Sequence, residues 1–298
     1  MSLSSYIFCK RCEKSDQKRD EGLKIPEDVT YVRNLRYGEH EKYHLLDICW
    51  PKKWEGREID INNDKLPVIV SVHGGGYVYG SKEVYQFYVS SLAQKGFAVI
   101  NHNYRLAPKY KFPAPLEDLN AVLCWMTEHA KDYPVDMDKV FLVGDSAGAQ
   151  IASQYGVICS NPDYEAIMEI KKPQITLRGL GLCCGLYDIR KKLATEGCKG
   201  ILRDYLTGKP DLFGEKLNII NYITKNYPPT YLFSSKGDFL LQDCKPMADH
   251  LTSKGVRCEY KIYGNAQTMH VFHVDMRNEF GTQANKEQAQ FFQTVLRL

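Results

Sequence analysis

The stretch KVFLVGDSAGAQIASQYG, residues 139–156, restricts the choice of fold more than any other part of the chain. It opens with a nearly continuous apolar run, which is typical of a β-strand buried on both faces. The motif G-x-S-x-G follows, centred on Ser146, and a helix-forming segment comes next. In this context the motif predicts a sharp turn that exposes the Ser146 hydroxyl at the N-terminus of a helix. The flanking positions must then be small, and Gly144 and Gly148 meet that need. The alternative is a glycine-rich turn with an incidental serine.

The rest of the chain alternates between strand and helix patterns. Further apolar runs occupy residues 67–72, 97–104, 177–184, 230–235 and 258–264. Helical patterns occupy residues 115–130, 244–255 and about 282–298. This alternation predicts an α/β fold with a mainly parallel sheet covered on both faces. Strands at residues 29–38 and 43–51 are expected to form its antiparallel edge, and residues 51–66 a surface loop.

Two segments fall outside this alternation. Residues 1–27 are polar and charged, and they are predicted to form a peripheral arm or a short helix. Residues 187–229 are charged and rich in glycine, and they are predicted to cross the sheet as a lid.

Composition excludes several classes of function. The net charge is only +3 over 298 residues and no basic run occurs, so nothing suggests a nucleic-acid partner. Charges begin at Lys10, which leaves no signal-peptide core, and no apolar run approaches the ~20 residues of a membrane helix. The ten cysteines are scattered, and the pair Cys9 and Cys12 lacks the second pair that a structural zinc site needs. We predict a soluble protein of the cytoplasm.

The stretch VHGGGYVYG, residues 72–80, directly follows a predicted buried strand. Three consecutive glycines allow the backbone to turn several N–H groups toward one point. A tetrahedral oxyanion needs such donors, and the loss of one costs ~3–4 kcal/mol of transition-state stabilisation. A phosphate loop is the alternative, but neither G-K-S/T nor G-x-G-x-x-G is present.

Together these motifs give the chain a resemblance to the hormone-sensitive lipase-like branch of the α/β-hydrolase fold, from about Tyr43 to the C-terminus. NYRLAPKYKFPAPLED, residues 103–118, is similar to a signature of that branch, with Lys109 in place of the usual glutamate. The stretch GDSAGA, residues 144–149, departs once from the G-D-S-A-G-G that is usual in that branch: Ala149 stands in place of the last glycine. The resemblance implies one domain over residues 1–298, built on an eight-stranded, mainly parallel sheet. It also implies a small cap made by residues 1–27 and 187–229.

The order of this branch is nucleophile, acid, histidine. Asp238 matches the position of the acid just after a strand, whereas Asp243 is expected at the start of the next helix. In GNAQTMHVFHVDM, residues 264–276, His270 matches the catalytic base, and His273 lies beyond it. A metal bound by the two histidines would need further ligands, and the sequence offers no matching cluster.

The resemblance thus implies a serine esterase that needs no metal or organic cofactor. The implied site residues are Ser146, Asp238 and His270, with the backbone N–H groups of Gly75, Gly76 and Ala147 as the oxyanion hole. Because residues 187–229 are less apolar than a lid that docks on lipid, we expect short acyl groups, acetyl to butyryl, on a small-molecule ester.

Other functions stay open at this point. An amide hydrolase, such as an arylformamidase or a small peptidase, would use the same motifs. A non-catalytic binding protein is another, like the plant gibberellin receptors that resemble this branch but have lost the histidine; the presence of His270 argues against it. Members of the branch often pair through the last strand, but no feature of this sequence requires a homodimer.

Overall fold

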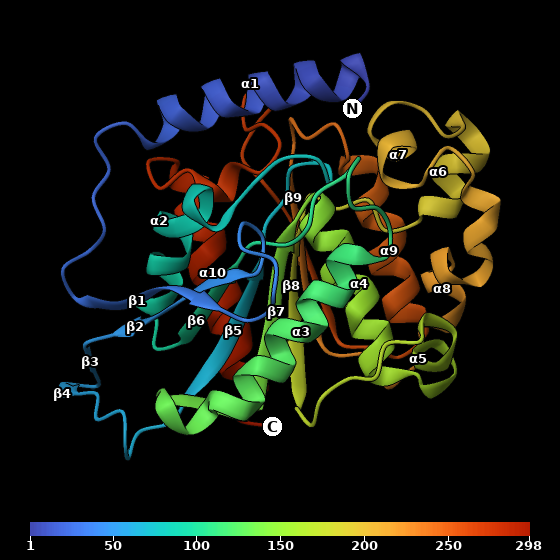
Figure 1. Ribbon diagram of the computed structural model, residues 1–298. Helices are drawn as coiled ribbons and strands as arrows, with labels where there is room; N and C mark the ends of the chain where they lie inside the picture. The colour runs from blue at the N-terminus through green and yellow to red at the C-terminus, as the bar shows by residue number, and fades with distance from the viewer.

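An eight-stranded sheet runs through the centre of the protein in the order β1-β2-β6-β5-β7-β8-β9-β10 (Figure 1). The computed structural model describes residues 1–298. The strands are β1 (Val29–Arg36), β2 (Leu45–Pro51), β5 (Leu66–Val72), β6 (Ala98–His102), β7 (Val135–Asp145), β8 (Leu177–Cys183), β9 (Thr230–Ser235) and β10 (Cys258–Tyr263). β2 runs antiparallel to both of its neighbours, whereas all pairs from β6 to β10 are parallel. The predicted α/β fold, with a mainly parallel sheet and an antiparallel edge, is confirmed.

Helices cover both faces of this sheet. On one face α2 (Lys82–Ala93) and α10 (Glu279–Val295) pack into a core that includes Ile69 of β5. On the other face α3 (Ala114–His129), α4 (Ala147–Ser160) and α9 (Leu241–Ser253) pack into a larger core that includes Val68 and Val70. Successive β5 residues thus point to opposite cores, which explains why the strand reads as an unbroken apolar run.

The predicted helices are present with boundaries shifted by one to three residues, and α2 was not predicted. Strands β3 (Lys53–Trp54) and β4 (Arg57–Glu58) form a short hairpin outside the sheet, where a surface loop was expected. A short helix, α5 (Pro162–Met168), follows α4. Two 3-10 turns, η1 (Ala130–Asp132) and η3 (Phe272–Val274), follow α3 and β10.

None of the helices combines the length and apolar character that crossing a bilayer requires. β10 is an edge strand, and pairing of two copies through it stays a prediction.

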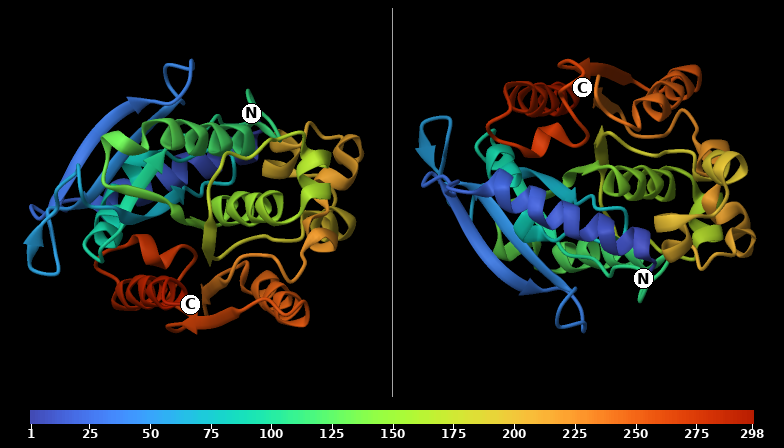
Figure 2. Two further views of the ribbon diagram at one scale, coloured as in Figure 1. Left: turned by 90° about the horizontal axis from the view of Figure 1, so that it is seen from below. Right: turned by 90° about the horizontal axis from the view of Figure 1, so that it is seen from above.

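Residues 1–27 and 187–229, which fall outside the alternation of strand and helix patterns, both contain helices. α1 (Leu3–Asp20) is an 18-residue helix, longer than the short helix that was expected as one alternative for residues 1–27, and it runs across one end of the molecule (Figure 2, right). Residues 187–229 form α6 (Ile189–Glu196), α7 (Gly200–Tyr205), the 3-10 segment η2 (Pro210–Leu217) and α8 (Ile219–Tyr222). The Ser2 N–H and hydroxyl both donate to the Asp204 carboxylate, at 2.8 and 2.9 Å, so the start of α1 is joined to α7.

Candidate functional site

Ser146 lies at the tight turn between β7 and α4. Its backbone has φ 53° and ψ −117°, a conformation that is rare for a residue with a side chain. A Cβ atom on Gly144 would overlap the carbonyl oxygen of Gly148, and one on Gly148 would overlap that of Val72. The turn can therefore form only with glycine at both positions, as the motif predicted.

Asp238 and His270 are brought together at the same end of the sheet. Asp238 follows β9 and His270 follows β10, and Nδ1 of His270 lies 2.6 Å from Asp238 Oδ1. Asp238 Oδ1 also accepts from the Leu240 N–H at 2.9 Å, and Oδ2 accepts from the Ser234 hydroxyl at 2.6 Å. These bonds hold the carboxylate in one orientation and fix which ring nitrogen of His270 faces it.

The electrostatics of the pair favour its charged form. Burial raises the pKa of Asp238, but the hydrogen bonds from His270 and Ser234 outweigh burial and hold the pKa below its ordinary value. Burial likewise lowers the pKa of His270, but the interactions with Asp238 and with the neighbouring Cys184 together outweigh burial, so this pKa lies above its ordinary value. The carboxylate thus stabilises an imidazolium at this position.

The alternative residues lie elsewhere. Asp243 is in the first turn of α9, where the sequence placed it. His273 lies in the short 3-10 helix η3 and is fully buried against Tyr88 and Phe233, and burial lowers its pKa to about 3. It is a neutral histidine of the core, and it forms no hydrogen bond with Asp238.

The glycine loop lies beside Ser146. Gly75 and Gly76 have φ 107° and 59°, and a Cβ atom on Gly75 would overlap the carbonyl oxygen of Tyr79. Their N–H groups donate to no other group of the protein, and Ala147, as the first residue of α4, has an N–H without a partner inside the helix. All three residues line one cavity together with Ser146 and His270.

One buried contact was not predicted. The Tyr85 hydroxyl, on α2, accepts from the Gly74 N–H and donates to Asp145 Oδ2, both at 2.8 Å. It therefore ties the glycine loop to the residue that precedes Ser146. Burial raises the pKa of Asp145 to about 7, although the hydrogen bond from Tyr85 opposes this. Sequence reasoning missed Tyr85 because α2 itself was not recognised.

The cavity that contains Ser146 has a volume of about 300 Å³. α1 contributes part of its wall, and so do residues from the 187–229 segment and the loop after β9. These lining residues are Phe8, Cys12, Asp16 and Arg19 of α1, then Lys192, Ile201 and Leu202 of the 187–229 segment with Leu186 just before it, and Phe239 and Leu240 after β9. The tyrosine hydroxyl of Tyr79, also in the wall, donates to Asp16 Oδ2 at 2.9 Å.

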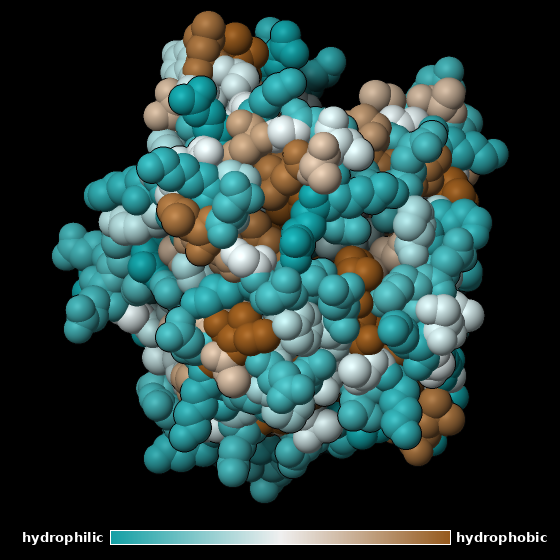
Figure 3. All heavy atoms as spheres, turned by 90° about the vertical axis from the view of Figure 1, so that its right-hand side faces the viewer, coloured by the Kyte–Doolittle hydropathy of each residue, from teal (hydrophilic) through white to brown (hydrophobic).

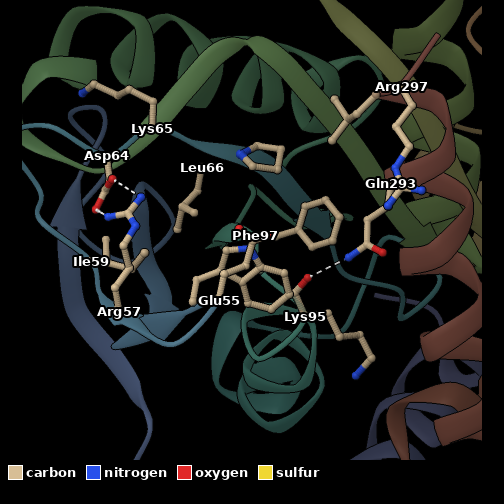
Figure 4. A pocket seen from close by; sticks show the side chains of 14 residues that line it. Glu55, Arg57, Ile59, Asp64, Lys65, Leu66, Lys95, Phe97, Gln293 and Arg297 are labelled. Atoms are coloured by element: carbon tan, nitrogen blue, oxygen red, sulfur yellow. Dashed lines mark hydrogen bonds and ion pairs between the residues drawn. The ribbon is translucent and has the colours of Figure 1, made fainter.

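A second cavity, of about 510 Å³, lies between the β3–β4 hairpin and the end of α10 (Figure 4). Its wall has no serine, cysteine or histidine, and its cations include Arg57, paired with Asp64 at 2.7 Å, and Lys65, bound to two backbone carbonyls. This second cavity therefore lacks the side chains that the predicted chemistry needs.

A serine on a strained strand-to-helix turn and an Asp–His pair, at the carboxyl ends of a mainly parallel sheet, define an α/β-hydrolase. A family profile described as alpha/beta hydrolase fold matches residues 69–274, and the chain belongs to this family. The match bears out the family resemblance drawn from the motifs.

Solved structures share the whole fold. Esterase B from Lactobacillus rhamnosis, in a structure with a tributyrin phosphonate, has a TM-score of 0.87 at 22% identity, over 98% of this chain and 94% of that one. The hyperthermophilic esterase from the archaeon Pyrobaculum calidifontis has a TM-score of 0.75 at 23% identity, over 99% and 92%. A bacterial heroin esterase has a TM-score of 0.75 at 21% identity, over 97% and 91%.

Proposed function

We propose that this protein is a serine carboxylesterase that hydrolyses short-chain acyl esters. The observation that carries the proposal is the 2.6 Å contact between His270 and Asp238 in the cavity where the strained turn presents Ser146. A non-catalytic binding role has no use for an Asp–His pair beside such a serine. The three similar structures are each named as esterases, which supports the same reaction class.

The proposed mechanism assigns one task to each group. Ser146 Oγ attacks the ester carbonyl while Nε2 of His270 takes its proton, and Asp238 keeps the other ring nitrogen protonated and stabilises the imidazolium. His270 then protonates the leaving alcohol, and water attacks the acyl-enzyme by the same path in reverse. His270 and Ser146 share no hydrogen bond in this structure; such bonds tighten when substrate binds.

The oxyanion is assigned to backbone donors. The N–H groups of Gly75, Gly76 and Ala147 are free and lie in the wall of the same cavity. Charge develops on the carbonyl oxygen only in the transition state, so donors fixed there in advance lower the barrier selectively.

The size and the walls of the cavity support a small acyl group. A volume of about 300 Å³ is at the lower limit for ligand pockets. We propose that α1 and residues 187–229 act as the cap that closes it. The face of the protein that carries the 187–229 segment is mainly hydrophilic, with apolar side chains in small separate groups (Figure 3), which does not suit adsorption to lipid.

Hydrolysis of p-nitrophenyl acetate, butyrate and octanoate tests the proposal, with S146A and S160A as a matched pair. Ser160 ends the helix that Ser146 precedes, and its hydroxyl binds only backbone carbonyls of that helix. We expect turnover to be highest for the two short esters, to vanish in S146A and to persist in S160A. Turnover that survives in S146A, or that rises toward octanoate, contradicts the proposal. Faster cleavage of a matched p-nitroanilide would instead assign an amide hydrolase. The cytoplasmic location stays a prediction.

A further inference from the structure

The thiol of Cys184 lies next to the Asp238–His270 pair, and the proposed mechanism does not use it. Cys184 directly follows β8 and is fully buried. Its Sγ, one ring nitrogen of His270 and one carboxylate oxygen of Asp238 all lie within 4.8 Å of one another. A second thiol, that of Cys183, lies 3.4 Å from Cys184 Sγ.

We propose that Cys184, Asp238 and His270 form an inhibitory binding site for a thiophilic divalent cation, Zn²⁺ or Cd²⁺. Thiolate, imidazole and carboxylate are the three ligand types that Zn²⁺ takes in proteins, at ~2.0–2.3 Å from the metal. With tetrahedral angles these lengths place nitrogen and oxygen ligands ~3.3 Å apart. The Asp238–His270 contact of 2.6 Å must therefore open by only a fraction of an ångström to admit the ion.

The charge balance of this site suits its burial. One thiolate and one carboxylate cancel the charge of a divalent cation, and the imidazole ligand is neutral. Since Cys184 and Asp238 are both buried, a neutral complex avoids the penalty of leaving a net charge inside the protein. The cation enters through the cavity at Ser146, which His270 lines.

Binding through Nδ1 of His270 accounts for inhibition. The cation displaces the proton of the Cys184 thiol to solvent. If His270 starts as the neutral imidazole, its ring proton moves from Nδ1 to Nε2 and one proton is released for each cation bound. If it starts as the imidazolium, the Nδ1 proton also leaves to solvent, Nε2 keeps its own, and two protons are released. Nε2 then carries a proton and cannot accept one from Ser146. This consequence rests on the proposed function, whereas the binding itself does not.

Two other thiols must be removed before the test. Cys12 lines the same cavity, and Cys9 lies one turn away on α1, so both would bind the same cations. The parent chain for the experiment is therefore C9S/C12S. In this background C184S is compared with C124S, which removes a half-buried thiol on α3, remote from the pair.

Cd²⁺ is titrated into each chain, and two signals are recorded. The first is the ultraviolet absorption of the cadmium–thiolate bond; the second is hydrolysis of p-nitrophenyl acetate relative to the metal-free rate of the same chain. We expect both the absorption and the inhibition in the parent and in C124S, with reversal by EDTA. We expect the half-effective Cd²⁺ concentration to rise at least ~10-fold in C184S, since one of three ligands is lost.

The same half-effective Cd²⁺ concentration in C184S and C124S would overturn the proposal. If the parent does not hydrolyse the ester, the proposed function fails, and the absorption titration still decides the metal site. If C184S does not fold, ¹⁵N-histidine spectra of the parent decide instead. One histidine whose Nδ1 loses its proton on Cd²⁺ addition while Nε2 carries one supports the site, and no change overturns it.

Discussion

Replacement of Tyr85 by phenylalanine removes one oxygen atom that makes two buried hydrogen bonds. In Y85F the Gly74 N–H loses its acceptor and Asp145 Oδ2 loses its donor. Asp145 Oδ1 has no hydrogen bond to begin with, and only Nε2 of the neutral His273 lies near it, at 4.0 Å. A buried group without its partner costs ~1–3 kcal/mol, and more when it is charged. We therefore expect the free energy of unfolding to fall by ~3 kcal/mol near neutral pH.

The pH dependence distinguishes this loss from a simple packing defect. Burial raises the pKa of Asp145 to about 7, whereas an unfolded aspartate ionises near ~3.9. Stability from this group is thus fully present at low pH and is lost as the pH rises through about 7. Above that pH the hydroxyl of Tyr85 donates to an ionised carboxylate, and such bonds contribute ~1 kcal/mol more than neutral ones. The loss in Y85F should therefore be ~1 kcal/mol larger at high pH than at low pH.

Urea unfolding followed by tryptophan fluorescence, at about pH 5 and about pH 8.5, measures the difference. Y88F is the matched control, because Tyr88 is also buried on α2 but its hydroxyl accepts from the neutral amide of Gln288 at 3.1 Å. We expect a loss of stability in Y88F that does not depend on pH. An equal loss in Y85F at both pH values, or the same pH dependence in Y88F, would refute the assignment of this contact. Because the contact also holds the glycine loop, kcat in Y85F should fall ~10-fold or more.

Three further predictions concern the site directly. D238N should lower kcat ~10⁴-fold by favouring the wrong tautomer of His270, whereas D243N should stay within a few-fold of the wild type; similar kcat values for the two variants would contradict the choice of acid. The ratio kcat/KM should rise with pH and level off above an apparent pKa higher than 6.5, because His270 must be neutral to act as base and Asp238 raises its pKa; a plateau reached below pH 6.5 would argue against this pair. G148A should abolish both activity and native folding yield, measured by circular dichroism, because its Cβ would overlap the carbonyl oxygen of Val72; a folded, active G148A would show that the turn can relax.

The parallel sheet could be predicted because its strands are buried on both faces. Burial on both faces produces continuous apolar runs, and these are visible without any knowledge of the partners. The helix α2 was missed for the opposite reason: its sequence, KEVYQFYVSSLA, mixes β-branched and aromatic residues with a lysine that proves to be buried. Lys82 is stable there because it forms an ion pair with Asp47 at 2.9 Å, on a strand far away in the sequence.

The residues of the candidate site also fall into those that a local sequence pattern marks and those that only distant contacts bring together. Ser146 and the glycine loop could be predicted because the local backbone geometry itself restricts the residue types. Asp238 and His270 could be placed only through the order of the family, since their contact joins positions 32 residues apart. The Tyr85–Asp145 contact spans 60 residues and belongs to no motif, so the sequence alone gave no signal for it.

The polar character of α1 explains why its role at the cavity was not apparent from the sequence. Ser5 is its only fully buried residue, so no apolar stripe marks the face that packs against the protein. Only Phe8 and Cys9 of this helix pack against the main core, and both are half-buried. Polar contacts add to this packing: Ser2 binds Asp204 at one end, Asp16 accepts from Tyr79, and Arg19 donates to the Val84 carbonyl at 2.8 Å. A helix held by such contacts can change its sequence without changing the core of the fold. The part of the cavity wall that α1 supplies is therefore separable from the sheet that positions Ser146, so one α/β-hydrolase scaffold can present differently shaped cavities at the same serine.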